Sequence, residues 1–490
     1  PGDGFTLDQL EVATTPLGLP FAPLPHLVTL QADQLHQRGV DGTGVLVLAI
    51  DNGADAYHKD LVAGRWENPG EVFLTTGVDD DGNGYVDDYI GWNFASDNNK
   101  PHNPPHPHGT GTAGLVIGDG TTNHLPTGVA PGAKLAYATV AGIAGHPQSK
   151  IAQLSQAYAY AITIGADLTT ASIGASELLP LERELLRATM DSVHAAGILS
   201  VAAAGNTGLD PVLQVPEKIG SPADCPGPWR HPDQPVVGGL GPVLAAGAFD
   251  LGLAAVAPSS SFGPVAWNPG PGLVYGDYPW AAGDPQQPGL IKPDLVGPVP
   301  VYTTDLHDGH QPQVAGTSFA APQVAGVAAL LLDLNPFALP RQVSAALQLT
   351  TTDHGAPGKD PLYGAGMPRA FEAARRIHTT VTATPLEPAV TDTVTVQVRG
   401  PAGTPYFLVL GSALGTTPLG LGADLDLTGS LLLLSSGMLA GHAAPWSQAF
   451  ALGGSPGLSG LVFHLQVLTD ESAGLLGSWN ASLVETVLVQ

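Results

Sequence analysis

The stretch 316–332 limits the fold of this chain more than any other. A turn of small residues, Gly316-Thr317-Ser318, leads there into an apolar run that ends at Leu332. Since apolar residues lie on every side of this run, we predict a fully buried helix. Pro322 is tolerated only in a first turn, so Ser318 should lie at or near the helix N-terminus. Unpaired N–H groups stabilise negative charge there, which suits a nucleophile. A serine N-cap is the alternative interpretation.

Apolar strand patterns alternate with helical patterns over residues 31–378. The expected strands are 45–50, 135–140, 167–173, 198–204 and 243–248. The expected helices are 32–38, 151–164, 181–196, 341–349 and 369–377. Such alternation predicts an α/β fold, in which a mostly parallel central sheet is covered by helices on both faces.

Two polar residues stand at the ends of expected strands: Asp51 follows 45–50 directly, and Asn206 follows 198–204 after Gly205. Ligands of open α/β sheets lie beyond such carboxyl ends, although both residues are also typical of turns. A histidine, His108, opens a glycine-rich stretch between them. A nucleophilic serine needs a base, and the base needs an orienting carboxylate. The order Asp51, His108, Ser318 offers one of each. This order, without a Gly-x-Ser-x-Gly elbow, argues against an α/β-hydrolase, which has the order Ser, Asp, His.

An acidic loop spans residues 79–88. Oxygen donors stand at positions 1, 3, 5, 7 and 9 of a calcium loop, and glycine stands at position 6. These donors are Asp79, Asp81, Asn83, the carbonyl of Tyr85, and Asp87. The closing glutamate at position 12 is absent, so water or distant residues must complete the site. A solvated acidic loop is the alternative, but crowded carboxylates favour bound Ca²⁺.

Composition excludes several classes of partner. The net charge is −26 with only 17 Lys and Arg, which argues against nucleic acid and anionic membranes and favours cation binding. No apolar run approaches the ~20 residues of a membrane span. The single cysteine, Cys225, excludes an intramolecular disulfide.

The pattern divides the chain into four parts. Residues 1–30 carry several prolines and no period, and we interpret them as an N-terminal arm or propeptide remnant. Residues 31–378 carry the α/β pattern, and 379–392, with Pro385 and Pro388, form an expected linker. Alternating strands at 393–398, 407–410, 449–452, 462–467 and 483–489 predict a small antiparallel β-sandwich over 393–490.

Four ordered motifs resemble those of the subtilisin-like serine proteases, the subtilases. They are Ala49-Ile50-Asp51-Asn52-Gly53, His108-Gly109-Thr110-Gly111-Thr112-Ala113-Gly114, Ala203-Ala204-Gly205-Asn206 and Gly316-Thr317-Ser318-Phe319-Ala320-Ala321-Pro322. The resemblance covers residues 30–378, and the acidic loop is similar to an insertion of bacterial secreted members. Asn52 stands where the family usually has Ser or Thr.

The resemblance implies a role for each motif residue. Ser318 attacks the scissile carbonyl, His108 takes its proton and Asp51 orients the imidazole. The side-chain amide of Asn206 and the backbone N–H of Ser318 hold the oxyanion. The substrate cleft is implied to comprise Ser172, Ile173, Gly174, Ala203, Ala204 and Gly205.

We therefore expect a secreted, calcium-supported serine endopeptidase that acts on proteins or peptides and carries an appended β-sandwich. One alternative is a catalytically silent subtilase fold that serves binding or adhesion. Another makes the C-terminal domain the functional unit, through contact with a surface or a polysaccharide. Esterase activity of the same triad is a third.

Overall fold

The computed structural model describes residues 23–72, 77–102, 106–140, 147–176, 178–226, 242–267, 278–285, 287–384, 393–418, 424–443, 445–451, 462–471, 478–482 and 485–488. The chain forms two compact units. The larger unit comprises Leu19–Asp333 and Leu339–Ala370, and the smaller one includes Leu334–Ala338 and Phe371–Gln490.

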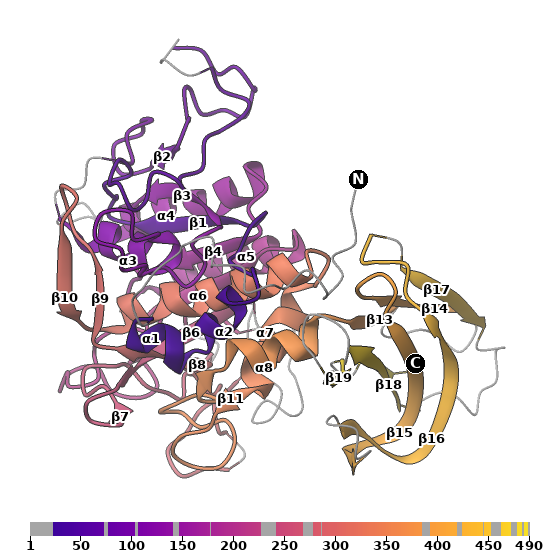
Figure 1. Ribbon diagram of the computed structural model, residues 1–490. Coiled ribbons are helices and arrows are strands. Elements are labelled where there is room, and N and C mark those ends of the chain that lie inside the picture. Colours follow the sequence, from indigo (N-terminus) through magenta and orange to yellow (C-terminus); the bar gives the residue numbers. More distant parts are fainter. Residues whose placement is uncertain are drawn as a thin grey trace. The chain divides into compact units, whose positions relative to one another are not determined.

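A mostly parallel sheet is the centre of the larger unit (Figure 1). Its strands follow the order β2-β3-β1-β4-β5-β6-β7, and β8 pairs with β6. The strands are β1 Leu46–Asp51, β2 Gly91–Asn93, β3 Lys134–Thr139, β4 Leu168–Ala171, β5 Leu199–Ala203, β6 Val243–Asp250, β7 Ala255–Val256 and β8 Leu295–Val299. All these pairs are parallel except β6 with β7. The predicted α/β class is confirmed.

Helices cover both faces of this sheet because successive strand residues point to opposite sides. The helices are α3 His108–Ile117, α4 Pro147–Thr163, α5 Pro180–Ala195, α6 Thr317–Leu334 and α7 Pro340–Leu349. In β6, Val243 and Ala245 belong to the core formed with α4 and α5. Ala248 belongs instead to a second core with Leu115 of α3 and Phe319 of α6.

The buried helix predicted after the serine turn is α6. It is 18 residues long and apolar enough to cross a membrane by composition, with a mean hydropathy of 1.4. However, 89% of it is buried within the protein, as expected of a core helix. Pro322 lies inside this helix, in its second turn rather than its first.

The N-terminal part differs from the expected arm 1–30. Residues 1–22 lie outside the described residues, but Pro25–Thr29 form helix α1, with His26 and Leu27 buried. The prolines around α1 break the helical pattern, so this short helix could not be recognised in the sequence. The predicted helix near residue 32 is confirmed as α2, Ala32–His36.

Short antiparallel pairs complete the larger unit. They are the hairpin of β9 Val301–Thr304 with β10 His310–Val314, and the pair of β11 Thr351–Thr352 with β12 Met367–Pro368. Helix α8, Ala370–Ile377, confirms the last helix of the α/β pattern and belongs to the smaller unit from Phe371 on.

The smaller unit contains two antiparallel sheets, as predicted for its C-terminal part. Their strands are β13 Thr380–Thr384, β14 Thr393–Arg399, β15 Pro405–Pro418, β16 Asp424–Met438, β17 Trp446–Ala451, β18 Val462–Glu471, β19 Ser478–Ala481 and β20 Glu485–Leu488. Valines of β14 share one buried core with residues of β15 and β18, so the sheets pack face to face.

The expected linker 379–392 is partly strand. Residues Thr380–Thr384 pair with β14 in antiparallel register, while 385–392 lie outside the described residues. The alternation of Thr and Val in this segment is a strand signal that the following prolines obscured.

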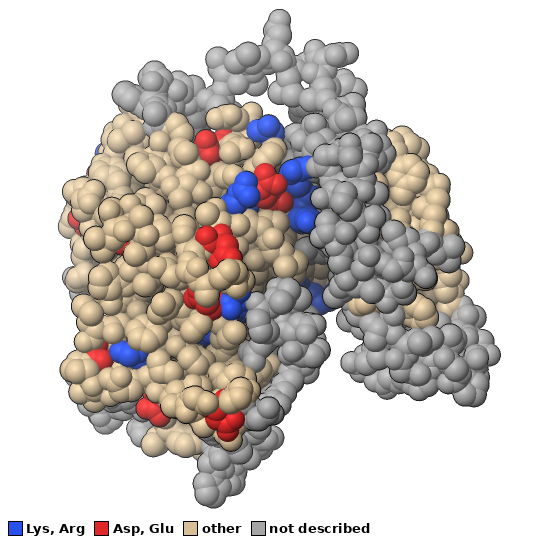
Figure 2. Space-filling view, turned by 90° about the horizontal axis from the view of Figure 1, so that it is seen from below, with Lys and Arg blue, Asp and Glu red and all other residues tan. Residues whose placement is uncertain are grey.

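Charged side chains are sparse on the face of the molecule that Figure 2 shows, and Lys and Arg lie there beside Asp and Glu. This agrees with a chain of which only 12% of residues are charged.

Candidate active site

Asp51 and His108 meet at the carboxyl end of β1. Asp51 is the last residue of β1 and His108 is the first of α3, and His108 Nδ1 lies 2.8 Å from Asp51 Oδ1. A carboxylate only accepts hydrogen bonds, so Nδ1 carries the hydrogen and the neutral ring keeps a lone pair on Nε2. Burial alone lowers the pKa of His108, but the hydrogen bond and charge of Asp51 outweigh it, and the pKa lies above its ordinary value.

Both oxygens of Asp51 are held. The backbone N–H of Asn52 donates to Oδ1 at 2.7 Å, and the hydroxyl of Thr112 donates to Oδ2 at 2.9 Å. Thr112 lies four residues after His108 on α3, so both side chains lie on one face of that helix. Sequence reasoning missed this support, although the spacing from His108 to Thr112 is a signal that could have revealed it.

The start of α3 packs against the turn after β1 because residue 109 is a glycine. A Cβ at Gly109 would lie 2.1 Å from the carbonyl oxygen of Gly53, which is far inside van der Waals contact. Any larger residue would push His108 away from the end of β1.

Ser318 is the second residue of α6, and its neighbour Phe319 lies against the imidazole of His108. The ring of its neighbour Phe319 has its centroid 5.4 Å from that of His108. The Ser318 hydroxyl donates to the carbonyl of Ser172 at 3.2 Å, and the Ser172 hydroxyl donates to the carbonyl of Ser318 at 2.7 Å. Among the described residues no hydrogen bond joins Ser318 to His108 in this arrangement.

Asn206 follows β5 and is oriented by the serine turn. Its Oδ1 accepts from the backbone N–H of Thr317 at 3.0 Å and from the Thr317 hydroxyl at 3.2 Å. That hydroxyl in turn accepts from the N–H of Gly205 at 3.1 Å. Because Oδ1 is occupied, the amide presents Nδ2 as its donor. Sequence reasoning missed Thr317 as the residue that fixes this amide.

The two expected walls of the substrate cleft differ in their backbone. Among the described residues, the backbones of Ile173 and Gly174 form no hydrogen bond, and both residues are half-buried. By contrast, Ala204 bonds through its N–H to Ala246 and through its carbonyl to Gly220. The carbonyl of Gly205 accepts from Ser261, and its N–H is bonded to Thr317. Ile173 and Gly174 therefore offer a free backbone edge, whereas Ala204 and Gly205 do not.

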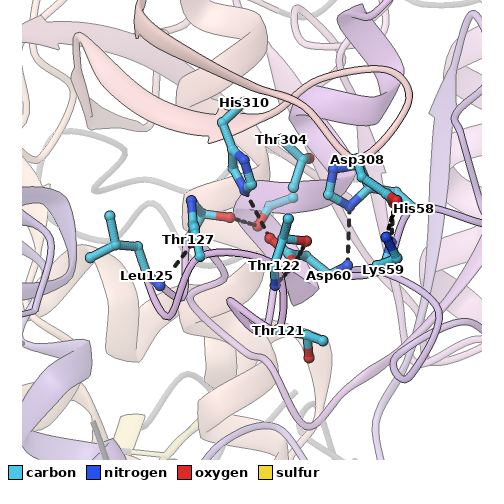
Figure 3. A network of polar contacts seen from close by, with 12 residues as sticks. His58, Lys59, Asp60, Thr121, Thr122, Leu125, Thr127, Thr304, Asp308 and His310 are labelled. Carbon is cyan, nitrogen blue, oxygen red and sulfur yellow. Dashed lines mark hydrogen bonds and ion pairs between the residues drawn. The ribbon is translucent and has the colours of Figure 1, made fainter. Parts of the chain in front are cut away.

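The hairpin of β9 and β10 precedes Ser318 and is held by a polar network (Figure 3). Asp60 is almost fully buried, and its Oδ2 lies 2.8 Å from Nε2 of His310 in β10. The backbone N–H of Asp60 donates to Nδ1 of His58 at 3.0 Å, and Nε2 of His58 donates to the carbonyl of Gly309 at 3.0 Å. The segment after β1 thus fixes the hairpin that leads to the serine turn. No local sequence pattern predicts this contact.

The acidic loop gathers three carboxylates, Glu71, Asp81 and Asp88, whose oxygens lie within 4.8 Å of one another. Among the residues that the structure describes, the buried Oε2 of Glu71 has no hydrogen-bond partner, as expected of an oxygen suited to a cation. Burial and the neighbouring carboxylates raise the pKa of Glu71 and of Asp88. The Nδ2 group of Asn83 donates to Asp81 Oδ2 at 3.1 Å and to Asp88 Oδ2 at 3.2 Å.

This cluster differs from the expected ligand set. Of the three expected carboxylates only Asp81 belongs to it. Asp79 instead accepts backbone N–H groups of its own turn, residues 82–84, and Asp87 accepts from Gly77 at 2.9 Å. The ring of Tyr85 packs edge-on against Tyr160. Sequence reasoning missed Glu71 because it precedes the acidic loop, and it missed Asp88 because position 10 is not a ligand position of a calcium loop.

Comparison of the sequence with known proteins identifies its family. A model of the Subtilase family matches residues 42–366. Mycosin-1 of Mycobacterium tuberculosis is 29% identical over 365 residues, which cover 68% of this chain and 69% of that protein. Subtilisin DY of Bacillus licheniformis is 29% identical over 366 residues, 74% of this chain and 99% of that protein. A calcium-dependent protease of Trichormus variabilis is 26% identical over 367 residues, 68% of this chain and 46% of that protein. Since the family match spans more than half of its length, the chain belongs to the subtilase family of serine proteases.

Proposed function

We propose that this chain is a secreted serine endopeptidase that works through Asp51, His108 and Ser318. The observation that carries the proposal is the 2.8 Å hydrogen bond between His108 Nδ1 and Asp51, formed beside the serine turn. It fixes the tautomer in which Nε2 can accept a proton, which is what a general base for serine requires.

The reaction starts when the Ser318 hydroxyl leaves the carbonyl of Ser172 and meets Nε2 of His108. Ser318 Oγ attacks the scissile carbonyl while His108 takes its proton. The imidazolium, stabilised by Asp51, gives that proton to the leaving amine, and an acyl-enzyme remains on Ser318. Water, activated by His108, then attacks the ester and releases the acid, and the hydroxyl of Ser318 is restored.

Two donors are proposed for the oxyanion. The backbone N–H of Ser318 has no acceptor within α6, because the first N–H groups of a helix are unpaired. The Nδ2 group of Asn206 is the second donor, since Thr317 occupies its Oδ1. Donors held in advance stabilise the developing charge more than mobile water does.

Protein or peptide substrates are proposed to bind as an added strand. The free backbone edge at Ile173 and Gly174 suits an extended peptide. Ala203, Ala204 and Gly205 line the other wall and contribute shape there rather than strand hydrogen bonds.

Calcium is the cation that we propose for the acidic loop. Ca²⁺ prefers oxygen ligands, and Glu71, Asp81 and Asp88 offer carboxylate oxygens together. Glu71 Oε2, which has no hydrogen-bond partner among the described residues, supports the proposal. Ligation by Asp79, Asn83, Tyr85 and Asp87, the other members of the expected set, stays a prediction.

Secretion is proposed from the resemblance of the acidic loop to the insertion of secreted bacterial members. Recovery of the mature chain from the culture medium tests it, and retention in the cell pellet contradicts it. Contact of the smaller unit with a surface or a polysaccharide stays a prediction, which glycan binding by the full chain would test.

Covalent labelling tests the proposed nucleophile directly. A sulfonyl fluoride should add to Ser318 in preference to other serines, because His108 is proposed to activate its hydroxyl. Mass spectrometry of a digest should place the label in the peptide that contains residues 316–322. The His108→Ala variant should lose the label, whereas equal labelling of that variant would exclude His108 as the base.

A further inference from the structure

The carbonyl of Ser318 lacks the usual donor of a helical residue. In an α-helix the carbonyl of each residue accepts from the N–H four residues later. For Ser318 that residue is Pro322, which lies inside α6, is buried and has no N–H. A carbonyl without a donor at this place would leave the backbone of the nucleophile without its usual restraint.

The side chain of Ser172 provides a donor from outside the helix. Its hydroxyl donates to the Ser318 carbonyl at 2.7 Å, and Ser172 is only 8% exposed. Ser172 follows β4, and its N–H donates at 3.3 Å to the carbonyl of Ile50, the neighbour of Asp51. One residue therefore links the strand that carries Asp51 to the helix turn that carries Ser318.

We propose that Ser172 is a positioning residue for the nucleophile, because its hydroxyl replaces the N–H that Pro322 lacks. The inference rests on the proposed function and gives Ser172 a side-chain role beside its backbone role in the cleft. Without the hydroxyl, the first turn of α6 is free to shift relative to His108. Small displacements of a reacting atom lower the rate steeply.

A double-mutant cycle of Ser172 and Pro322 tests this inference. Ser172→Ala should lower kcat about tenfold, the size expected for one unsatisfied buried carbonyl, and leave KM within about threefold because the backbone edge is intact. In the Pro322→Ala background the new N–H at residue 322 can serve the Ser318 carbonyl. There, Ser172→Ala should lower kcat by less than about threefold. Ser172→Thr keeps the hydroxyl and should retain most of the activity.

Ser200→Ala is the matched control. Ser200 lies in β5 and is fully buried, and its hydroxyl accepts from that of Thr169 at 2.9 Å. Among the described residues, its side chain forms no hydrogen bond with the serine turn. This variant removes the same atom and should leave kcat unchanged, even where it lowers the melting temperature.

The outcomes separate the inference from the proposed function. The inference alone is overturned if the wild type hydrolyses peptides and Ser172→Ala lowers kcat by the same factor in the wild-type and Pro322→Ala backgrounds. A wild type without any hydrolysis overturns the proposed function, and thermal unfolding of the same four proteins then decides the inference. A smaller loss of Tm from Ser172→Ala in the Pro322→Ala background supports the hydrogen-bond exchange, and equal losses of Tm overturn it.

Discussion

Acid should destabilise the larger unit through His26, which connects α1 to the segment that follows α3. His26 is 2% exposed, and its Nε2 donates to the carbonyl of Thr127 at 3.0 Å. The hydroxyl of Thr127 donates to the carbonyl of Gly114 in α3, the helix that begins at His108. Protonation of His26 would place an unpaired charge in this contact.

The size of the effect follows from the pKa of His26. Burial lowers this pKa from 6.5 to about 4, although the hydrogen bond to Thr127 acts in the opposite direction, and the nearby His36 lowers it further. Between pH 6.5 and 4 the unfolded chain therefore binds the proton more tightly than the folded one. The contribution of neutral His26 to the free energy of unfolding is complete above pH 6.5. About 3 kcal/mol of it is lost as the pH falls to 4, at about 1.4 kcal/mol per pH unit.

Urea unfolding of the wild type and His26→Gln, from pH 7 to pH 4 at constant ionic strength, measures this contribution. Glutamine can still donate to Thr127 but does not titrate, so the wild-type advantage in unfolding free energy should shrink by about 3 kcal/mol over this range. His307→Gln replaces an exposed histidine and should follow the wild type throughout. A difference between wild type and His26→Gln that is independent of pH would refute the reasoning.

Four further outcomes are expected. Asn206→Ala should lower kcat by about 10²–10³, a range taken from oxyanion donors measured in this family. A rate within about threefold of wild type would remove Asn206 from the mechanism. Thr112→Val leaves Asp51 Oδ2 without its donor and should lower kcat about tenfold, whereas an unchanged kcat would show that this support is dispensable. Calcium chelation should lower Tm, and Asp81→Ala should reduce that response; Tm values unaffected by the chelator would count against a stabilising site. Because the neutral imidazole is the base and the pKa of His108 is raised, the acid limb of kcat/KM should have its midpoint above pH 6.5, and a midpoint at or below 6.5 would contradict this assignment.

The central sheet and the polar residues at the ends of its strands could be predicted, because their sequence signals are local. Continuous apolar runs mark buried parallel strands, and Asp51 directly follows such a run. The turn before α6 and the apolar helix itself are equally local patterns. These features were therefore predicted at their observed positions.

The residues that hold the site together could not be found in the same way. Thr112 and Asp51 are 61 positions apart, and Ser172 and Ser318 are 146 apart. Contacts of this range depend on the packing of strands and helices, which a single sequence does not state. The strand β10 was missed for another reason, since it contains a proline and lacks the apolar alternation of a strand.

Hydrolysis of a fluorescence-quenched casein by the wild type and by Ser318→Ala tests the central claim most directly. We predict hydrolysis by the wild type and a loss of nearly all of it in the variant, since Ser318 forms the acyl-enzyme. Equal hydrolysis by both proteins would show that another nucleophile acts. Failure of the wild type to cleave casein would contradict the proposed endopeptidase activity itself.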